Sequence, residues 1–165
     1  MTVANLDPID LKILSELMRD GRASIVELAS RVGLSPSPCL RRVRRLEEEK
    51  VLKSYQAIVD REKVGLGLTI WVQATAANYE RKTILKLRSA FNEFEEIVAW
   101  YVMAGHPGYL IQVVSPGLAS YESFLMERLL TLPLRDVRSQ FVIAERKATA
   151  VLPLGHLPAA APEPA

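Results

Sequence analysis

Four arginines within positions 41–45 form the densest group of cationic side chains in the sequence. Guanidinium groups suit phosphate oxygens and the edge of guanine, because each can donate two parallel hydrogen bonds. On a helix, at about 100° per residue, Arg41, Arg44 and Arg45 share a face with Ser37 and Pro38. We therefore expect this face, with the start of the helix, to contact duplex DNA through Ser35, Ser37, Pro38, Arg41, Arg42, Arg44 and Arg45.

A solvated helix face is the alternative, because Glu48 and Glu49 could pair with Arg44 and Arg45 four residues earlier. Two features favour DNA. Gly33 lies between two short helical stretches, which gives the spacing of a helix-turn-helix, and the arginines precede the glutamates. The first residues of the second helix in such a motif reach base edges, and its backbone N–H groups can receive a phosphate.

Three helices are expected before residue 60, because apolar residues recur there every three or four positions. Asp7 is suited to cap the first helix, and Ser24 with Glu27 makes a capping box for the second. Ser35 is expected to cap the third helix, which runs to about residue 50. Residues 53–59 alternate weakly and predict a short strand or wing.

The remainder predicts alternating strands and helices in the order βαββαβ, which is the ferredoxin-like plan. The fold class is therefore α+β, with a (winged) helix-turn-helix followed by a ferredoxin-like domain. We expect domains at 1–60 and 61–152, and a disordered tail at 153–165 that holds four of the ten prolines. The expected elements are strand 68–77, helix 80–94, strand 97–104, turn 105–108, strand 109–114, helix 118–132 and strand 137–145.

The strand at 97–104 is apolar on both faces, although two helices can cover only one face of the sheet. A second copy of the sheet is the favoured cover, which predicts a homodimer with Val98, Trp100 and Val102 in its interface. The alternative is that the first three helices fold back over that face.

Composition excludes several classes of protein. The single cysteine, Cys39, cannot form an internal disulfide and lies on the apolar side of its helix, so we expect it to be a core residue. No Cys/His group has zinc-ligand spacing, and no cofactor or metal is expected. The apolar runs are too short to span a bilayer, and a cytoplasmic location is expected. Residues 1–65 hold 12 Lys/Arg against 10 Asp/Glu, whereas residues 66–165 hold nine of each.

Residues 6–55 closely resemble the DNA-binding domain of the leucine-responsive regulatory protein/AsnC (Lrp/AsnC) family, most specifically through VGLSPSPCLRRVRRLE. SYESFLMERLLTLP and KATAVLPL fit the family's second domain, so the resemblance covers about residues 6–155. It implies a dimer that assembles into tetramers, octamers or larger rings, binds pseudo-palindromic duplex DNA and controls transcription. It also implies an amino-acid effector held between dimers, near the turn after the second strand of the regulatory domain.

That turn departs from the family's common Gly-Asp-x-Asp-Tyr pattern, because both acidic positions are changed. A carboxylate is the natural partner of an α-ammonium group. The effector could be another molecule, with a carboxylate that His106 contacts; it could be an amino acid held by other groups; or the turn could bind nothing and be a plain hairpin. The expected effector-binding residues are Gly105, His106, Pro107, Gly108, Tyr109 and Gln140.

Two other functions are alternatives to a ligand-responsive regulator. An architectural DNA-binding protein would share the fold but lack the effector. A small-molecule enzyme on a ferredoxin-like fold is disfavoured, because His106 and His156 lie far from Cys39 and from any carboxylate pair in the sequence, and no glycine-rich phosphate loop occurs. The sequence therefore predicts a regulator and no enzyme.

Overall fold

The computed structural model describes residues 5–106, 108–147 and 151–157, and it divides the chain into two compact units. Unit 1 combines residues 1–58 with residues 147–165, and unit 2 spans residues 59–146. The first boundary lies near the expected one. The second differs from it, because the described residues 151–157 group with the N-terminal helices.

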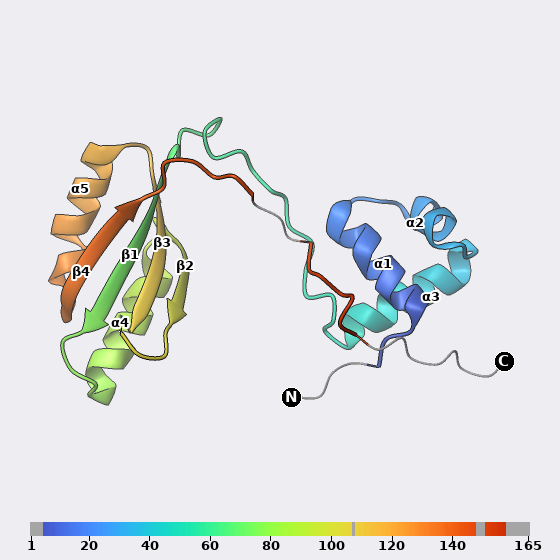
Figure 1. Ribbon diagram of the computed structural model, residues 1–165, viewed down its shortest axis with the longest axis horizontal. Helices are drawn as coiled ribbons and strands as arrows, with labels where there is room; N and C mark the ends of the chain where they lie inside the picture. The colour runs from blue at the N-terminus through green and yellow to red at the C-terminus, as the bar shows by residue number, and fades with distance from the viewer. Residues whose placement is uncertain (1–4, 107, 148–150, 158–165) are drawn as a thin grey trace. The chain divides into compact units, whose positions relative to one another are not determined.

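The described part of unit 1 contains three helices, α1 (Pro8–Arg19), α2 (Ile25–Val32) and α3 (Pro36–Glu48), labelled in Figure 1. Asp7 caps α1, the Ser24–Glu27 capping box begins α2, and Gly33 ends α2 in the left-handed conformation, with φ 76°. Their apolar stripes meet in one core, in which the largest fully buried side chains are Ile13, Leu28 and Leu46. Cys39 is fully buried in this core, as expected of a small apolar side chain.

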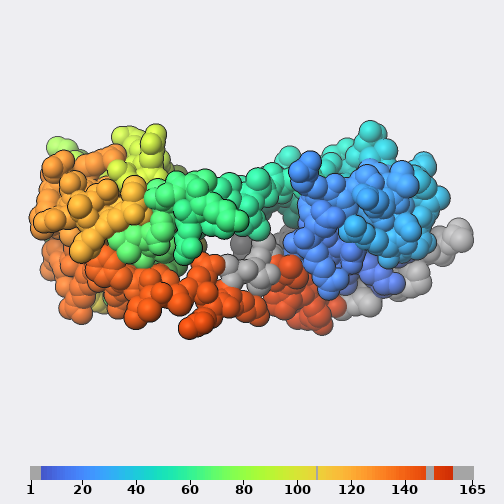
Figure 2. Space-filling model, turned by 90° about the horizontal axis from the view of Figure 1, so that it is seen from above, coloured from blue at the N-terminus to red at the C-terminus, as the bar shows by residue number. Residues whose placement is uncertain are grey.

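Two expectations for unit 1 are corrected. Residues 53–59 form no strand. The start of the expected disordered tail is ordered: Leu154 and Leu157 pack against the helical core, and the backbone N–H of Leu152 lies 3.3 Å from the Met18 sulfur. Figure 2 shows this dark red segment against the blue helices. Residues 158–165 of the expected tail lie outside the described residues.

Unit 2 has the predicted βαββαβ order and is ferredoxin-like. All neighbouring strands are antiparallel, and their spatial order is β2-β3-β1-β4 (Figure 1). The last expected helix ends early and continues as a short 3-10 turn, which lets the last strand begin three residues sooner than predicted. The elements are β1 (Leu68–Ala76), α4 (Arg81–Glu93), β2 (Ile97–Val102), β3 (Tyr109–Ser115), α5 (Leu118–Glu127), η1 (Leu129–Thr131) and β4 (Leu134–Phe141).

Helices α4 and α5 cover one face of the sheet. Phe91 of α4 and Phe124 of α5 lie in the same core as Ile70 and Val72 of β1 and Ile111 of β3. Within the described part of unit 2, no element covers the opposite face. That face carries Trp71 of β1, Tyr101 of β2 and Leu110 of β3, and the rings of Trp71 and Tyr101 lie 6.4 Å apart.

The expected face of Trp100 is wrong. The register between β2 and β3 shifts between Ile97 and Ala99, which inserts one residue and reverses the alternation that follows. Trp100 therefore packs edge-on against Phe91, at 5.6 Å between ring centroids, and donates a hydrogen bond to Asn92 of α4. Val102 pairs with Tyr109, whose ring is also on the helix side, while Val98 lies exposed at the bulge.

Candidate nucleic-acid interface and effector turn

The outer face of α3 presents the exposed polar side chains of Ser37, Arg41 and Arg44. They line a shallow depression of about 480 Å³ together with Leu40, Arg45 and Glu48. Neither Arg41 nor Arg44 has an ion-pair partner among the residues that the structure describes. In particular, Arg44 makes no ion pair with Glu48, one turn later. The alternative of an internally paired charged face therefore fails for these two arginines.

Arg42 and Arg45 are placed differently from the other two arginines. The Arg42 Nη1 atom contacts carboxylate oxygens of Asp7 and of Asp10, the latter at 2.9 Å. Arg45 pairs through Nη2 with the other oxygen of Asp10, a residue with no exposed surface. Arg45 lines the outer depression as expected and its side chain is 40% exposed, but unlike Arg41 and Arg44 it is paired with the buried carboxylate of α1.

The pKa values of Asp7 and Arg42 are both displaced in the direction that favours the charged form. Burial alone would raise the pKa of Asp7, but hydrogen bonds from the Asp10 backbone N–H and the Arg42 guanidinium outweigh it and lower that pKa. Burial likewise opposes the charged form of Arg42, but hydrogen bonds to Asp7 and Asp10 raise its pKa. The charged forms of Asp7 and Arg42 therefore stabilise one another at the junction of α1 and α3.

The start of α3 offers a ligand two polar groups, the Ser35 hydroxyl and the Ser37 backbone N–H. Ser35 is the N-cap residue, as predicted, but its hydroxyl makes no capping hydrogen bond. The first turn contains no acidic residue, and Pro38 is half-buried behind the exposed Ser37. Among residues 36–39, only the Ser37 backbone N–H can donate to a phosphate, because Pro36 and Pro38 have no N–H and the Cys39 N–H donates to the Ser35 carbonyl at 3.3 Å.

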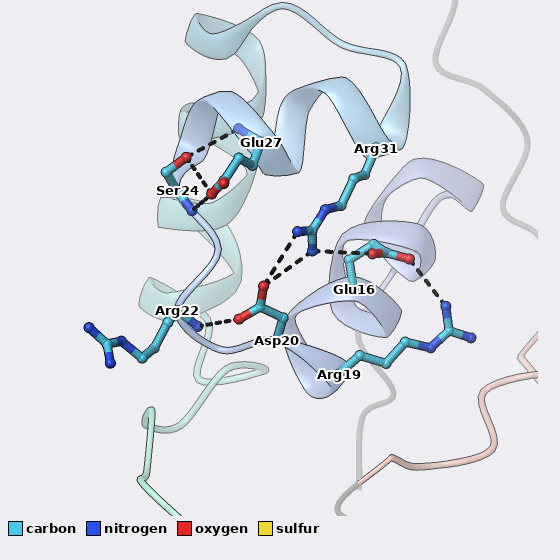
Figure 3. Close-up of polar contacts among 7 residues, drawn as sticks. All are labelled: Glu16, Arg19, Asp20, Arg22, Ser24, Glu27 and Arg31. Carbon is cyan, nitrogen blue, oxygen red and sulfur yellow. Dashed lines mark hydrogen bonds and ion pairs between the residues drawn. The ribbon is translucent and has the colours of Figure 1, made fainter.

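A second polar network fixes α2 against α1 (Figure 3). Arg31 of α2 lies 3.4 Å from the Asp20 carboxylate and 3.7 Å from Glu16 of α1. At the other end of α2, the Ser24 backbone N–H donates to the Glu27 carboxylate at 2.8 Å. Since α3 packs on both helices through its buried side, these contacts set the position of its exposed side.

In the turn at residues 105–109, the side chain of His106 contacts two neighbouring strands. Its Nε2 atom lies 3.2 Å from the Thr75 hydroxyl of β1 and 3.1 Å from the Asp136 carboxylate of β4. Asp136 also accepts a hydrogen bond from Arg138 at 3.1 Å. A carboxylate is therefore present beside the turn, although the turn itself has none.

The other expected effector residues are dispersed. Gly105 is exposed with φ 90°, and Gly108 is half-buried, while Pro107 lies outside the described residues. Tyr109 faces the core, where its ring lies 5.5 Å from that of Phe91, so it has a packing role. Gln140 lies on the uncovered sheet face, 3.4 Å from Gln73.

Sequence reasoning missed Asp10, Thr75 and Asp136. An acidic residue on the apolar side of an amphipathic helix was the available signal for Asp10, which lies three residues before the buried Ile13. Asp136 has φ 53° at an irregular register between β1 and β4, and aspartate is one of the few residues that tolerates this conformation. No local pattern pointed to Thr75.

Comparison with known families divides the chain in a similar way. Residues 6–53 match the winged helix-turn-helix DNA-binding family, and residues 69–152 match the Lrp/AsnC ligand-binding domain. The leucine-responsive regulatory protein of Klebsiella pneumoniae is 39% identical over 144 residues, which are 87% of this chain and 88% of that protein. The protein of the same name from Escherichia coli K12 is 38% identical over the same share of each chain.

Solved structures agree with these matches. A transcriptional regulator of Neisseria meningitidis, crystallised in complex with L-Met, superposes with a TM-score of 0.89 at 34% identity, covering 92% of this chain and 98% of that one. An AsnC-family regulator of Agrobacterium tumefaciens gives a TM-score of 0.87 at 34% identity, covering 92% and 99%.

Proposed function

This chain belongs to the Lrp/AsnC family of DNA-binding transcriptional regulators and carries that family's ligand-binding domain, and from this premise we propose how it engages DNA, a second copy and an effector. It is a regulator and not an enzyme. No helix in the described part of the chain is long and apolar enough to cross a membrane. A cytoplasmic location is part of the proposal, because a regulator must reach the chromosome.

We propose that α3 enters the major groove with Ser37 at base edges and Arg41 and Arg44 at phosphates. The observation that carries this assignment is that both arginines are exposed on one helix face without an internal partner among the described residues. Phosphate contacts orient a helix in the groove, and residues at its N-terminal end contact bases. The test compares wild-type protein with the Ser37→Ala variant on a duplex that the wild type selects from a random library. The variant should bind the selected duplex more weakly than wild type does, and should bind random duplex with the same affinity.

The uncovered sheet face is proposed as the homodimer interface. Trp71, Tyr101 and Leu110 place aromatic and aliphatic surface at its centre, with Gln73 and Gln140 beside them. Packing two such faces together would remove this surface from water, and two α3 helices would then bind two half-sites. Assembly of dimers into tetramers, octamers or larger rings is proposed from the family.

The effector is proposed to be an amino acid or a related metabolite bound beside the 105–109 turn. His106, Gly105 and Gln140 are the proposed contacts, with Asp136 supplying the carboxylate that the turn lacks. The Neisseria relative's complex with L-Met supports the class of ligand. A thermal-shift screen of the twenty amino acids and common keto acids tests this, because a ligand of the folded state raises the melting temperature. No shift with any compound would favour an effector-independent architectural protein.

A further inference from the structure

Asp10 is a buried carboxylate, and each of its two oxygens accepts a hydrogen bond from an arginine of α3. One oxygen accepts from Arg42 at 2.9 Å, and the other accepts from Arg45 and from the Asp7 backbone N–H, the latter at 3.1 Å. Its side chain is only 1% exposed. A buried charge is tolerated when it is paired, and removing one partner is strongly destabilising. Moving either arginine from Asp10 to a phosphate would therefore remove one of the partners of this buried carboxylate.

The orientation of Arg45 also indicates that its guanidinium is engaged by the protein. Its Nε atom is buried and has no hydrogen-bond partner within the described residues, so this edge of the guanidinium faces protein, while the side chain as a whole is 40% exposed. Arg42 is held more firmly, because it bridges Asp7 and Asp10 with its side chain only 26% exposed. The four arginines of α3 thus divide into two that are neutralised by α1 and two that have no ion-pair partner in the described part of the chain.

We propose that Asp7 and Asp10 are specificity-determining residues, which engage Arg42 and Arg45 and so restrict the phosphate contacts of α3 to Arg41 and Arg44. Phosphate contacts supply non-specific affinity and its salt dependence, whereas base contacts supply discrimination. Withholding two cations from the phosphates lowers binding to random sequence and leaves the base contacts at the helix start intact. The inference rests on the proposed placement of α3 in the groove.

The test compares full-length wild type with the Asp7→Asn/Asp10→Asn variant, in which the amide side chain at the N-cap of α1 remains a competent cap. Anisotropy of a labelled random-sequence duplex is measured over a salt series, beside a duplex selected by the wild-type protein. Freeing two guanidinium groups steepens the slope of log K against log salt by about 1.8 per protomer, at about 0.9 per phosphate. The ratio of selected to random affinity falls. An unchanged slope in a variant with native circular dichroism would overturn the proposal.

A second variant keeps the test decisive if the first does not fold. Replacing Asp7 and Asp10 by Asn, and Arg42 and Arg45 by Gln, leaves no buried charge in this network and retains hydrogen-bonding groups at all four positions. The proposal requires its salt slope to equal that of wild type, and a slope flatter by about 1.8 per protomer would refute it. The Arg41→Ala/Arg44→Ala variant separates the premise from the inference: if its slope matches wild type, α3 is not the DNA contact at all.

Discussion

Replacing Arg41 and Arg44 by alanine removes the two cations that α3 presents without an internal partner in the described part of the chain. Neither side chain contributes to the buried core of unit 1, so the variant should fold as wild type does. If each arginine neutralises one phosphate, the slope of log K against log salt falls by about 1.8 per protomer and by about 3.6 per dimer. Between about 50 and about 200 mM salt, the wild-type dimer would therefore lose about 150-fold more affinity than the variant.

Fluorescence anisotropy with a labelled random-sequence duplex measures this difference, and sedimentation velocity confirms that both proteins have the same assembly state. The matched control is Arg81→Ala/Lys82→Ala, which removes two exposed cations from the start of α4 in unit 2. The control should keep the wild-type slope. A variant slope within experimental error of wild type, or a control that falls as far, would show that α3 is not the phosphate contact.

Three further outcomes are expected. Tyr101→Asp places a charge at the centre of the uncovered sheet face, so the variant should sediment with half the mass of the dimer. The control, Leu85→Asp at an exposed position of α4, should keep the mass of the dimer. Equal masses for the two variants would exclude this face as the interface. Phe91→Ala should lower the free energy of unfolding by about 3–5 kcal/mol in urea, and a loss below about 1 kcal/mol would contradict the packing described. Burial and then the hydrogen bond to Glu47 raise the pKa of Tyr55 to about 12, so the stability it contributes is complete below pH 10 and is lost as the pH approaches 12. In an ultraviolet titration, the Tyr55 phenol of the Glu47→Gln variant should ionise at lower pH than in wild type. An unchanged midpoint of this titration would contradict the contribution assigned to Glu47.

Features set by neighbours in sequence were predictable. The Ser24–Glu27 capping box, the Gly33 turn and the βαββαβ order all follow from local chemistry and periodicity, and the structure has each of them. The apolar side of α3 is also predicted correctly, because Val43 and Leu46 recur at helical spacing.

Features set by distant partners were not predictable. Arg45 is 35 residues from Asp10, and helical periodicity alone cannot say that a carboxylate of another helix will hold it. The predicted face of Trp100 is wrong because a single inserted residue in β2 reverses every side chain after it. Asp136 has no local signal, because the register irregularity that turns it toward His106 involves pairing between β1 and β4.

Because Leu154 and Leu157 pack against the helical core, the helical unit is built from an early and a late segment of the sequence. A fragment that stops at residue 58 would lack the apolar contacts that Leu154 and Leu157 make with the helical core. The sheet unit, in contrast, is formed by one continuous segment, residues 59–146. The two units therefore differ in how they could be separated: the sheet unit is continuous in the sequence, whereas the helical unit combines two segments that are far apart in it.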